Sequence, residues 1–205
     1  MKAIILDMYG VIIKQTGDDF APYVQQTFPC LTAEEINAVW FQADIGEISS
    51  LEVWARLGFR GNLEAIEKEY LDTLELNQGF HEFVSAAGKQ FKLAILSNDS
   101  SGWSRYIREK FGMNPYFDAI NISGDLKMKK PDRRVFELTM KQLGVEAGDC
   151  VYIDDRRKNL GAARALGMDT VLFNSRNVEY EGNTVTNFYE LADLLGIPEF
   201  DSGRL

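Results

Sequence analysis

The sequence predicts a doubly wound, Rossmann-like α/β protein: a parallel sheet with helices on both faces and a small helical insert after the first strand. From residue 80 onward, short apolar runs bounded by turn signals alternate with helical patterns, as in parallel sheets. Between residues 20 and 80 the patterns are helical, and no alternating strand pattern occurs. We therefore expect a core domain of residues 1–14 and 81–205 and a helical cap domain of residues 15–80.

The first predicted strand covers residues 3–6, four apolar residues that lead directly into Asp7. A short, continuous apolar run is typical of a strand that is buried on both faces. Gly10 allows the sharp turn that takes the chain off the sheet. Asp7 is therefore expected at the carboxyl end of the strand, where open α/β sheets bind their ligands.

The insert contains two capping-box patterns, at residues 32–35 and 49–52, and each predicts the start of a helix. A third helix is expected from about residue 63 to 74. The apolar core of the insert is expected to consist of Trp40, Phe41, Trp54 and Phe59.

The remaining elements follow in alternation. Strands are expected at residues 91–96, 119–123, 151–153 and 170–173. Helices are expected around residues 80–87, 103–111, 133–143, 160–166 and 191–194. Gly144 and Gly167 stand where helices commonly end. The tail after Pro198 is expected to be loose.

Composition narrows the possible functions. The chain has 205 residues, 45% of them hydrophobic, and a net charge of −9, which argues against a nucleic-acid or anionic-membrane partner. No stretch has the length of a transmembrane helix. A strand begins almost at Met1, so we expect no signal peptide, and the two cysteines predict a reducing cytoplasm. Because His81 is the single histidine, a multi-histidine metal site is excluded.

Polar side chains follow several of the predicted strands. They are Asp7, Ser97, Asn98, Asp154 and Asp155, and Lys130 follows a further strand. Because the carboxyl ends of parallel strands meet at one edge of a sheet, we expect these side chains to form a cluster.

The chemistry of such a cluster is that of phosphoryl transfer. Converging carboxylates repel one another unless a cation joins them, and oxygen ligands of this kind suit Mg²⁺. Lys130 would add a second positive charge, and Ser97 with helix-terminal N–H groups would hold phosphate oxygens. Asp7 would then be free to attack phosphorus as a nucleophile.

Four motifs in order resemble the haloacid dehalogenase superfamily, in its phosphatase-like branch with a small helical cap. They lie at residues 7–11 (DMYGV), 96–98 (LSN), 130–132 (KPD) and 154–163 (DDRRKNLGAA). Residues 46–49 (GEIS) also match a phrase frequent in this branch. Each motif alone is weak, but together they cover essentially the whole chain at the proper spacing.

The resemblance implies a role for each matched position. Asp7 would be the nucleophile, and Asp7, Asp155 and the backbone carbonyl of Tyr9 would bind Mg²⁺. Asp154 would support the metal site from behind or through water. Lys130, together with Ser97 and the nearby Asn98, would hold the phosphate. The implied substrate is a small phosphorylated metabolite.

Tyr9 departs from the family pattern, because the family's phosphatases usually have an aspartate there as acid and then base. A phenol has a pKa near ~10, so it can donate a proton but is a poor base at neutral pH. Tyrosine at this position is similar to the family's metal-independent dehalogenases, which also use an aspartate nucleophile. Those enzymes lack the paired carboxylates of Asp154 and Asp155, so we weigh phosphatase above 2-haloacid dehalogenase.

Two alternatives therefore stay open: the dehalogenase, and a non-catalytic protein that binds a phosphorylated metabolite. A halide-binding arginine in the insert would favour the dehalogenase, and Arg56 and Arg60 are available there. Arg156, Arg157 and Lys158 are interpreted as surface charge. The substrate and the oligomeric state are not predicted.

Overall fold

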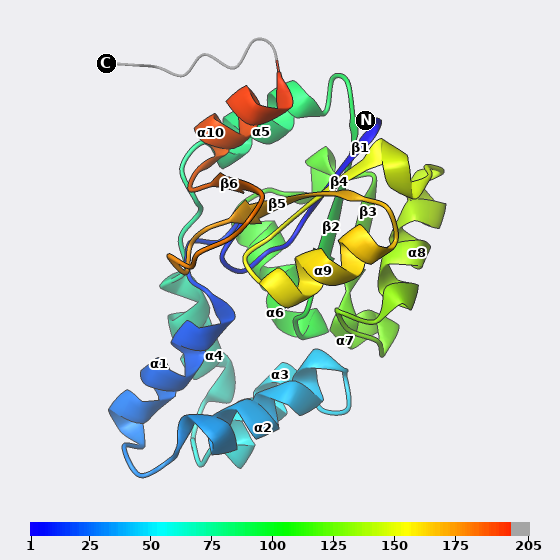
Figure 1. Ribbon diagram of the computed structural model, residues 1–205. Coiled ribbons are helices and arrows are strands. Elements are labelled where there is room, and N and C mark those ends of the chain that lie inside the picture. The colour runs from blue at the N-terminus through cyan, green and yellow to red at the C-terminus, as the bar shows by residue number, and fades with distance from the viewer. Residues whose placement is uncertain (198–205) are drawn as a thin grey trace, which may run out of the picture.

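The computed structural model, described here for residues 1–197, contains a six-stranded parallel sheet in the order β3-β2-β1-β4-β5-β6 (Figure 1). The strands are β1 (Ala3–Leu6), β2 (Lys92–Ser97), β3 (Ala119–Ile122), β4 (Cys150–Asp154), β5 (Asp169–Phe173) and β6 (Asn183–Val185). Every neighbouring pair is parallel. The order runs outward in both directions from β1, which is the doubly wound arrangement that the sequence predicts.

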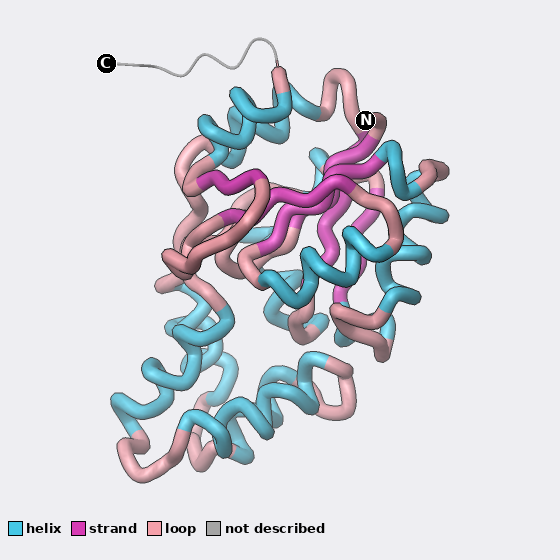
Figure 2. The backbone as a smooth tube through the Cα atoms, viewed as in Figure 1, coloured by secondary structure: helices cyan, strands magenta, loops and turns pink. Residues whose placement is uncertain are grey.

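Helices cover both faces of the sheet (Figure 2). The helices outside the insert are α5 (Phe80–Ala87), α6 (Ser101–Lys110), α7 (Ser123–Leu126), α8 (Arg133–Leu143), α9 (Arg157–Ala165) and α10 (Phe188–Leu195). Residues of α5, α6 and α10 pack with Ile4 and Leu6 of β1, whereas residues of α8 and α9 pack with Ala3 and Ile5. Alternate residues of β1 thus enter two separate cores, which explains why all four are apolar.

The insert contains four helices, α1 (Phe20–Thr27), α2 (Ala33–Asp44), α3 (Ser50–Arg56) and α4 (Leu63–Asp72), and a 3-10 turn, η1 (Gly17–Asp19). Further 3-10 turns are η2 (Asn114–Tyr116) and η3 (Ala147–Asp149). Both predicted capping boxes are present, at Thr32 and at Ser49. Figure 1 shows these helices beyond the carboxyl ends of the strands. Their aromatic side chains pack against α6: the ring centroids of Phe20 and Trp103 lie 5.1 Å apart.

Two lysines of the loop after α7 hold the end of α2. The Nζ of Lys127 donates to the carbonyl of Gly46, and the Nζ of Lys129 lies 2.5 Å from Oδ2 of Asp44. Gly46 has a φ of +66°, and a Cβ there would lie 2.3 Å from the carbonyl oxygen of Gly124. Only glycine fits this close approach between the insert and the sheet-containing part of the chain.

One strand, one aromatic side chain and the tail differ from the sequence prediction or lie outside the described residues. The sixth strand, β6, is absent from the prediction because its first two residues are exposed and polar. Phe41 is 50% exposed and does not belong to the core of the insert, whereas Trp54 is fully buried. The prediction about the tail falls on residues outside those described. Within residues 1–197, no helix has the length and apolar character needed to cross a membrane.

Candidate active site

Asp7 lies directly after β1 and is almost fully buried. Its backbone N–H donates to the carbonyl of Ile153 in β4 (3.0 Å), and its Oδ1 accepts from the N–H of Met8 (2.6 Å). Gly10 has a φ of +75°, and a Cβ there would lie 2.7 Å from Oδ2 of Asp155. The glycine turn thus brings the chain after β1 directly against the end of β4.

Lys130 joins two carboxylates at the floor of the site. Its Nζ lies 2.8 Å from Oδ1 of Asp7 and 2.9 Å from Oδ2 of Asp154, and its side chain is only 1% exposed. Asp154 is fully enclosed and also accepts from the hydroxyl of Tyr152 and from the side-chain amide of Asn159. These contacts fix the ammonium group beside Asp7.

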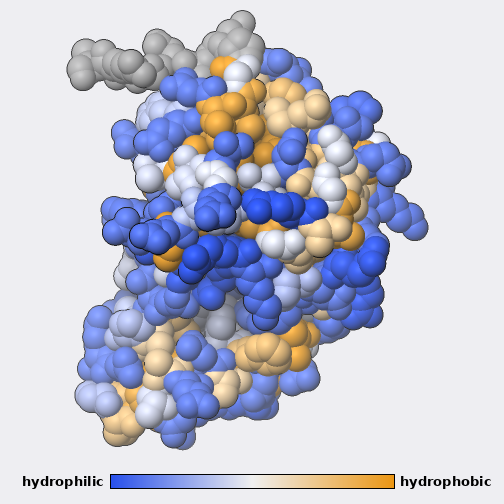
Figure 3. Space-filling view, in the orientation of Figure 1, coloured by the Kyte–Doolittle hydropathy of each residue, from blue (hydrophilic) through white to orange (hydrophobic). Residues whose placement is uncertain are grey.

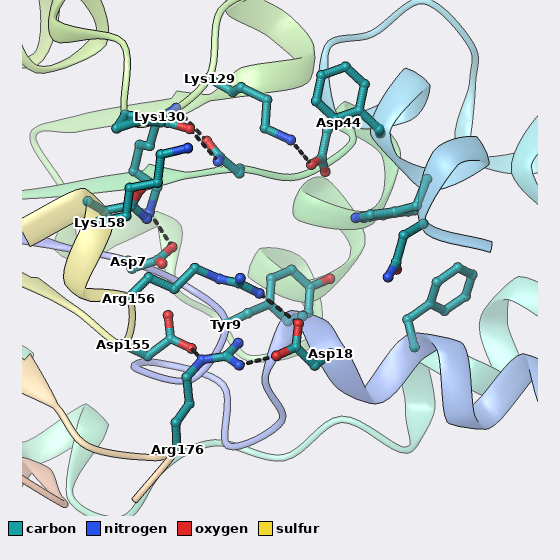
Figure 4. Close-up of a pocket in the computed structure, with 18 of the residues that line it drawn as sticks. Asp7, Tyr9, Asp18, Asp44, Lys129, Lys130, Asp155, Arg156, Lys158 and Arg176 are labelled. Carbon is teal, nitrogen blue, oxygen red and sulfur yellow. Dashed lines mark hydrogen bonds and ion pairs between the residues drawn. The ribbon is translucent and has the colours of Figure 1, made fainter. Parts of the chain in front are cut away.

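Asp155 is paired with an arginine from the other side of the site. Nε of Arg176 lies 2.5 Å from Oδ2 of Asp155, and the same guanidinium pairs with Asp18 of η1. Asp18 also pairs with Arg156 at 2.9 Å. Figure 4 shows this chain of charges running from Asp155 toward the insert. One end of the carboxylate cluster is therefore linked to the segment that enters the insert.

Asp7, Asp154 and Asp155 offer oxygen atoms that all lie within 4.8 Å of one another. Their three negative charges face two positive ones, from Lys130 and Arg176. Buried carboxylate oxygens at this spacing, with negative charge left over, are a donor set that fits Mg²⁺. The residues present therefore fit the ion that the sequence suggests.

Burial raises the pKa of Asp7 well above its usual value, with Asp154 and Asp155 adding to the rise and Lys130 opposing it. Burial and the charge of Asp154 also raise the pKa of Asp155, and the positive charge of Arg176 opposes this rise. For Asp154, Lys130 and the hydroxyl of Tyr152 outweigh burial and hold the pKa below its usual value. The carboxylates repel one another, and a divalent cation would relieve that repulsion.

Ser97 and Asn98 differ in what they contact. The Oγ of Ser97 is buried and has no hydrogen-bond partner among residues 1–197. Asn98 exchanges two hydrogen bonds with the backbone of Lys130: its amide donates to the carbonyl (3.1 Å) and its Oδ1 accepts from the N–H (2.8 Å). Asn98 thus fixes the loop that presents Lys130, while Ser97 keeps an unused donor and acceptor.

A cavity of about 600 Å³ opens above this floor. Of the predicted site residues, those that line it are Asp7, Tyr9, Asn98, Lys130 and Asp155, whereas Ser97 and Asp154 lie behind its surface. Figure 3 shows hydrophilic side chains gathered where the insert meets the rest of the molecule. The structure therefore brings together side chains from four strand ends, as the strand order requires.

Several lining residues escaped the sequence analysis. Asp18 and Asp44 come from the insert and Arg176 from the loop after β5, and none of them stands in a recognisable motif. Arg156, Arg157 and Lys158 are exposed, as expected for surface charge, and all three also line the cavity. Their position directly after Asp155 at the start of α9 was the available signal.

Comparisons with known proteins show what this chain is similar to. A family model described as haloacid dehalogenase-like hydrolase matches residues 1–167. Glyceraldehyde 3-phosphate phosphatase of Methanocaldococcus jannaschii is 31% identical over 100 residues, covering 45% of this chain and 43% of the relative. (S)-2-haloacid dehalogenase 1 of a Pseudomonas species is 22% identical over 220 residues, covering 97% of this chain and 96% of the relative.

A solved structure of a HAD family enzyme from Bacteroides thetaiotaomicron, in complex with magnesium and inorganic phosphate, has a similar fold. The TM-score is 0.74 at 18% sequence identity, covering 88% of this chain and 98% of that one. The match covers less than half of two curated relatives: this chain spans 35% of the length of one and 43% of the length of the other. Phosphatases and a dehalogenase thus both occur among the relatives.

Proposed function

Since this chain belongs to the haloacid dehalogenase-like hydrolases, we propose that it is a Mg²⁺-dependent phosphomonoester hydrolase acting on a small phosphorylated metabolite. One observation carries the proposal: three carboxylates lie within 4.8 Å of one another, with the ammonium of Lys130 between two of them, and Asp7 and Asp155 line the floor of a cavity with Asp154 directly behind it. The cavity volume, about 600 Å³, suits a small metabolite.

In this proposal Asp7 attacks phosphorus and forms an aspartyl-phosphate, while the leaving group departs as an alcohol. Lys130 holds phosphate oxygens at the cavity floor, and the Oγ of Ser97, unpartnered among residues 1–197, is the donor directly behind it. Asn98 keeps Lys130 in position through its backbone. Mg²⁺, held by Asp7, Asp155 and the backbone carbonyl of Tyr9, would neutralise negative charge so that an anionic phosphate can approach Asp7. Asp154 orients Lys130 from behind.

Tyr9 limits this chemistry. Burial raises the pKa of its phenol well above the usual value, and the charges of Asp99 and Asp44 add to the rise. A group that stays protonated can donate a proton to the leaving oxygen, but it cannot activate the water that cleaves the aspartyl-phosphate. We therefore expect the second step, hydrolysis of the aspartyl-phosphate, to be slow.

The alternative enzyme is a metal-independent 2-haloacid dehalogenase with Asp7 as nucleophile. Tyr9 and the full-length likeness to a 2-haloacid dehalogenase favour it. The buried carboxylates of Asp154 and Asp155 argue against it, because they would repel the carboxylate of a haloacid in the absence of a metal. Arg56 and Arg60, the candidate halide ligands, bond within the insert to Gln42 and to backbone carbonyls.

We further propose that residues 15–80 act as a cap over the site and that the protein works in the cytoplasm. The contacts of Lys127 and Lys129 with the end of α2 support the first point. The second rests on two cysteines that are both free, one exposed and one buried.

The decisive experiment is phosphate release from a generic aryl phosphate, with Mg²⁺ or with a chelator, by the parent and by Asp7→Asn. Asp193→Asn, which removes a carboxylate from the exposed face of α10, is the control. Turnover that needs Mg²⁺ and that is lost only in Asp7→Asn supports the proposal. Chloride release from a 2-haloacid without metal would establish the dehalogenase instead, and ligand binding without turnover would establish a binding protein.

A further inference from the structure

Asp44 is a buried carboxylate that the proposed chemistry does not use. It is the last residue of α2, and its side chain is only 8% exposed. Oδ2 lies 2.5 Å from the Nζ of Lys129, whereas Oδ1 has no hydrogen-bond partner among the described residues. Asp44 lines the same cavity as Asp7, and Figure 4 shows its carboxylate pointing toward Lys129 and the middle of the pocket.

Lys129 fixes the direction of this carboxylate. The Nζ of Lys129 also lies 4.3 Å from the centroid of the Phe41 ring, so the ammonium is held between an anion and an aromatic face. Burial raises the pKa of Asp44, and pairing with Lys129 opposes that rise. Oδ1 is thus a fixed acceptor that lacks a donor, and a buried polar atom in this condition is unfavourable.

The hydroxyl of Tyr9 is the complementary group in the same cavity. It too is enclosed and lacks a hydrogen-bond partner within residues 1–197. A phenol is protonated at neutral pH, so its O–H is a donor that needs an acceptor. The cavity therefore presents an unsatisfied acceptor from the insert and an unsatisfied donor from the loop after β1.

A hydroxyl group is the simplest group that satisfies both, because it donates and accepts. An ammonium group would satisfy Asp44 but offers nothing to Tyr9. A carboxylate would accept from Tyr9 but would be repelled by Asp44. We infer that Asp44, held by Lys129, selects phosphate esters whose leaving group carries a free hydroxyl, with Tyr9 contacting the same part of the substrate. This inference rests on the proposed function and names its substrate class.

The walls of the cavity agree with this class. Trp40 and Phe41 line it with aromatic surface, and Asn37 adds an amide. Aromatic faces and amides suit a hydroxylated carbon skeleton, which exposes C–H groups as well as hydroxyls.

The test compares four small phosphate esters whose leaving groups carry hydroxyls, an ammonium, a carboxylate or no further polar group: glycerol 3-phosphate, phosphoethanolamine, phosphoglycolate and ethyl phosphate. For the parent, kcat/KM should be highest for the hydroxylated ester and lowest for phosphoglycolate. Asp44→Asn should reduce the ratio of kcat/KM for glycerol 3-phosphate to that for ethyl phosphate by about tenfold, because a charged acceptor is lost. Tyr9→Phe should reduce the same ratio by a smaller factor.

Glu47→Gln is the matched control, since it removes one negative charge from an exposed position three residues along the chain. It should leave the ratio unchanged. Equal kcat/KM for hydroxylated and plain esters, or a ratio that Asp44→Asn does not alter, would overturn the inference.

Failure of the proposed function would be recognised separately. If the aryl phosphate and all four esters are left intact, the hydrolase proposal fails. The affinities of the same esters for the Asp7→Asn variant, measured by calorimetry, still test the selectivity. Tighter binding of glycerol 3-phosphate than of phosphoglycolate would support the inference, and equal affinities would contradict it.

Discussion

Tyr9 decides how fast the proposed hydrolase can turn over. Its phenol stays protonated in a buried position, so no base stands two residues after Asp7. Tyr9→Asp should therefore hydrolyse an aryl phosphate at least about tenfold faster than the parent, since general acid–base catalysis commonly contributes more than that. The measurement is kcat for phosphate release in saturating Mg²⁺.

Tyr9→Phe is the control for this change, because it removes the hydroxyl without adding a carboxylate. If Tyr9→Asp is no faster than Tyr9→Phe, and both bind Mg²⁺ as the parent does, Tyr9 does not limit turnover.

Arg176 is expected to weaken metal binding. Its guanidinium pairs at 2.5 Å with Asp155, the carboxylate that we propose as a Mg²⁺ ligand. Because the positive charge of Arg176 neutralises that oxygen and repels a second cation, Arg176→Gln should tighten Mg²⁺ binding by about tenfold. Isothermal titration calorimetry with Mg²⁺ measures the change.

Arg156→Gln serves as the comparison, since the Arg156 side chain pairs with Asp18 but its contact with Asp154 is through the backbone N–H. Its Mg²⁺ affinity should change less. Weaker binding in Arg176→Gln would mean that the arginine orients Asp155 rather than competing for it.

At the scale of elements, the turn after β1 is the most constrained segment of the site. Gly10 combines a φ of +75° with a Cβ position 2.7 Å from Asp155, whereas Gly112 has a φ of +60° and open space around it. The left-handed conformation costs each alanine variant about 1–2 kcal/mol. Gly10→Ala should lose about 1–3 kcal/mol more, because overpacking adds to the strain.

Urea unfolding of the two variants measures this difference in the free energy of unfolding. Equal losses in Gly10→Ala and Gly112→Ala would show that the turn can move away from Asp155 without cost.

Elements whose signal is local could be predicted from the sequence. Thr32 with Glu35 and Ser49 with Glu52 form reciprocal hydrogen bonds within four residues, so their pattern is visible in the sequence. β6 gives no such signal, because its pairing with β5 depends on the sheet edge already being present. The prediction that Phe41 belongs to the core of the insert was wrong for a related reason. Its ring faces the pocket only because α2 packs against the loop that carries Lys129.

At the scale of the whole molecule, the sheet order accounts for which part of the site was predictable. Asp7, Lys130 and Asp155 follow strands, and parallel strands bring their carboxyl ends together whatever the loops do. Asp18, Asp44 and Arg176 reach the cavity through the placement of the insert and of the loop after β5. That placement depends on long-range contacts, such as Lys127 with Gly46, that no local pattern encodes.

The repulsion among the three buried carboxylates should appear in the stability of the whole chain. Mg²⁺ that binds the folded state and not the unfolded one stabilises the fold by about 2.7 kcal/mol at 100 times its Kd. For a chain of 205 residues this corresponds to a rise in Tm of roughly 5–10 °C. Differential scanning calorimetry in Mg²⁺ and in a chelator measures the shift.

The same scans on variants locate the effect. Asp7→Asn should lose most of the Mg²⁺-induced rise in Tm, because one of the three converging carboxylates becomes neutral. In chelator, the Tm of Asp7→Asn should lie at most a few degrees below that of the parent. The change weakens the pair with Lys130, but it also relieves repulsion from Asp154 and Asp155. Asp193→Asn should keep the full rise. A parent Tm that is the same in Mg²⁺ and in chelator would mean that Lys130 and Arg176 already balance the negative charge of the cluster. The proposed Mg²⁺ dependence of the hydrolase would then be wrong.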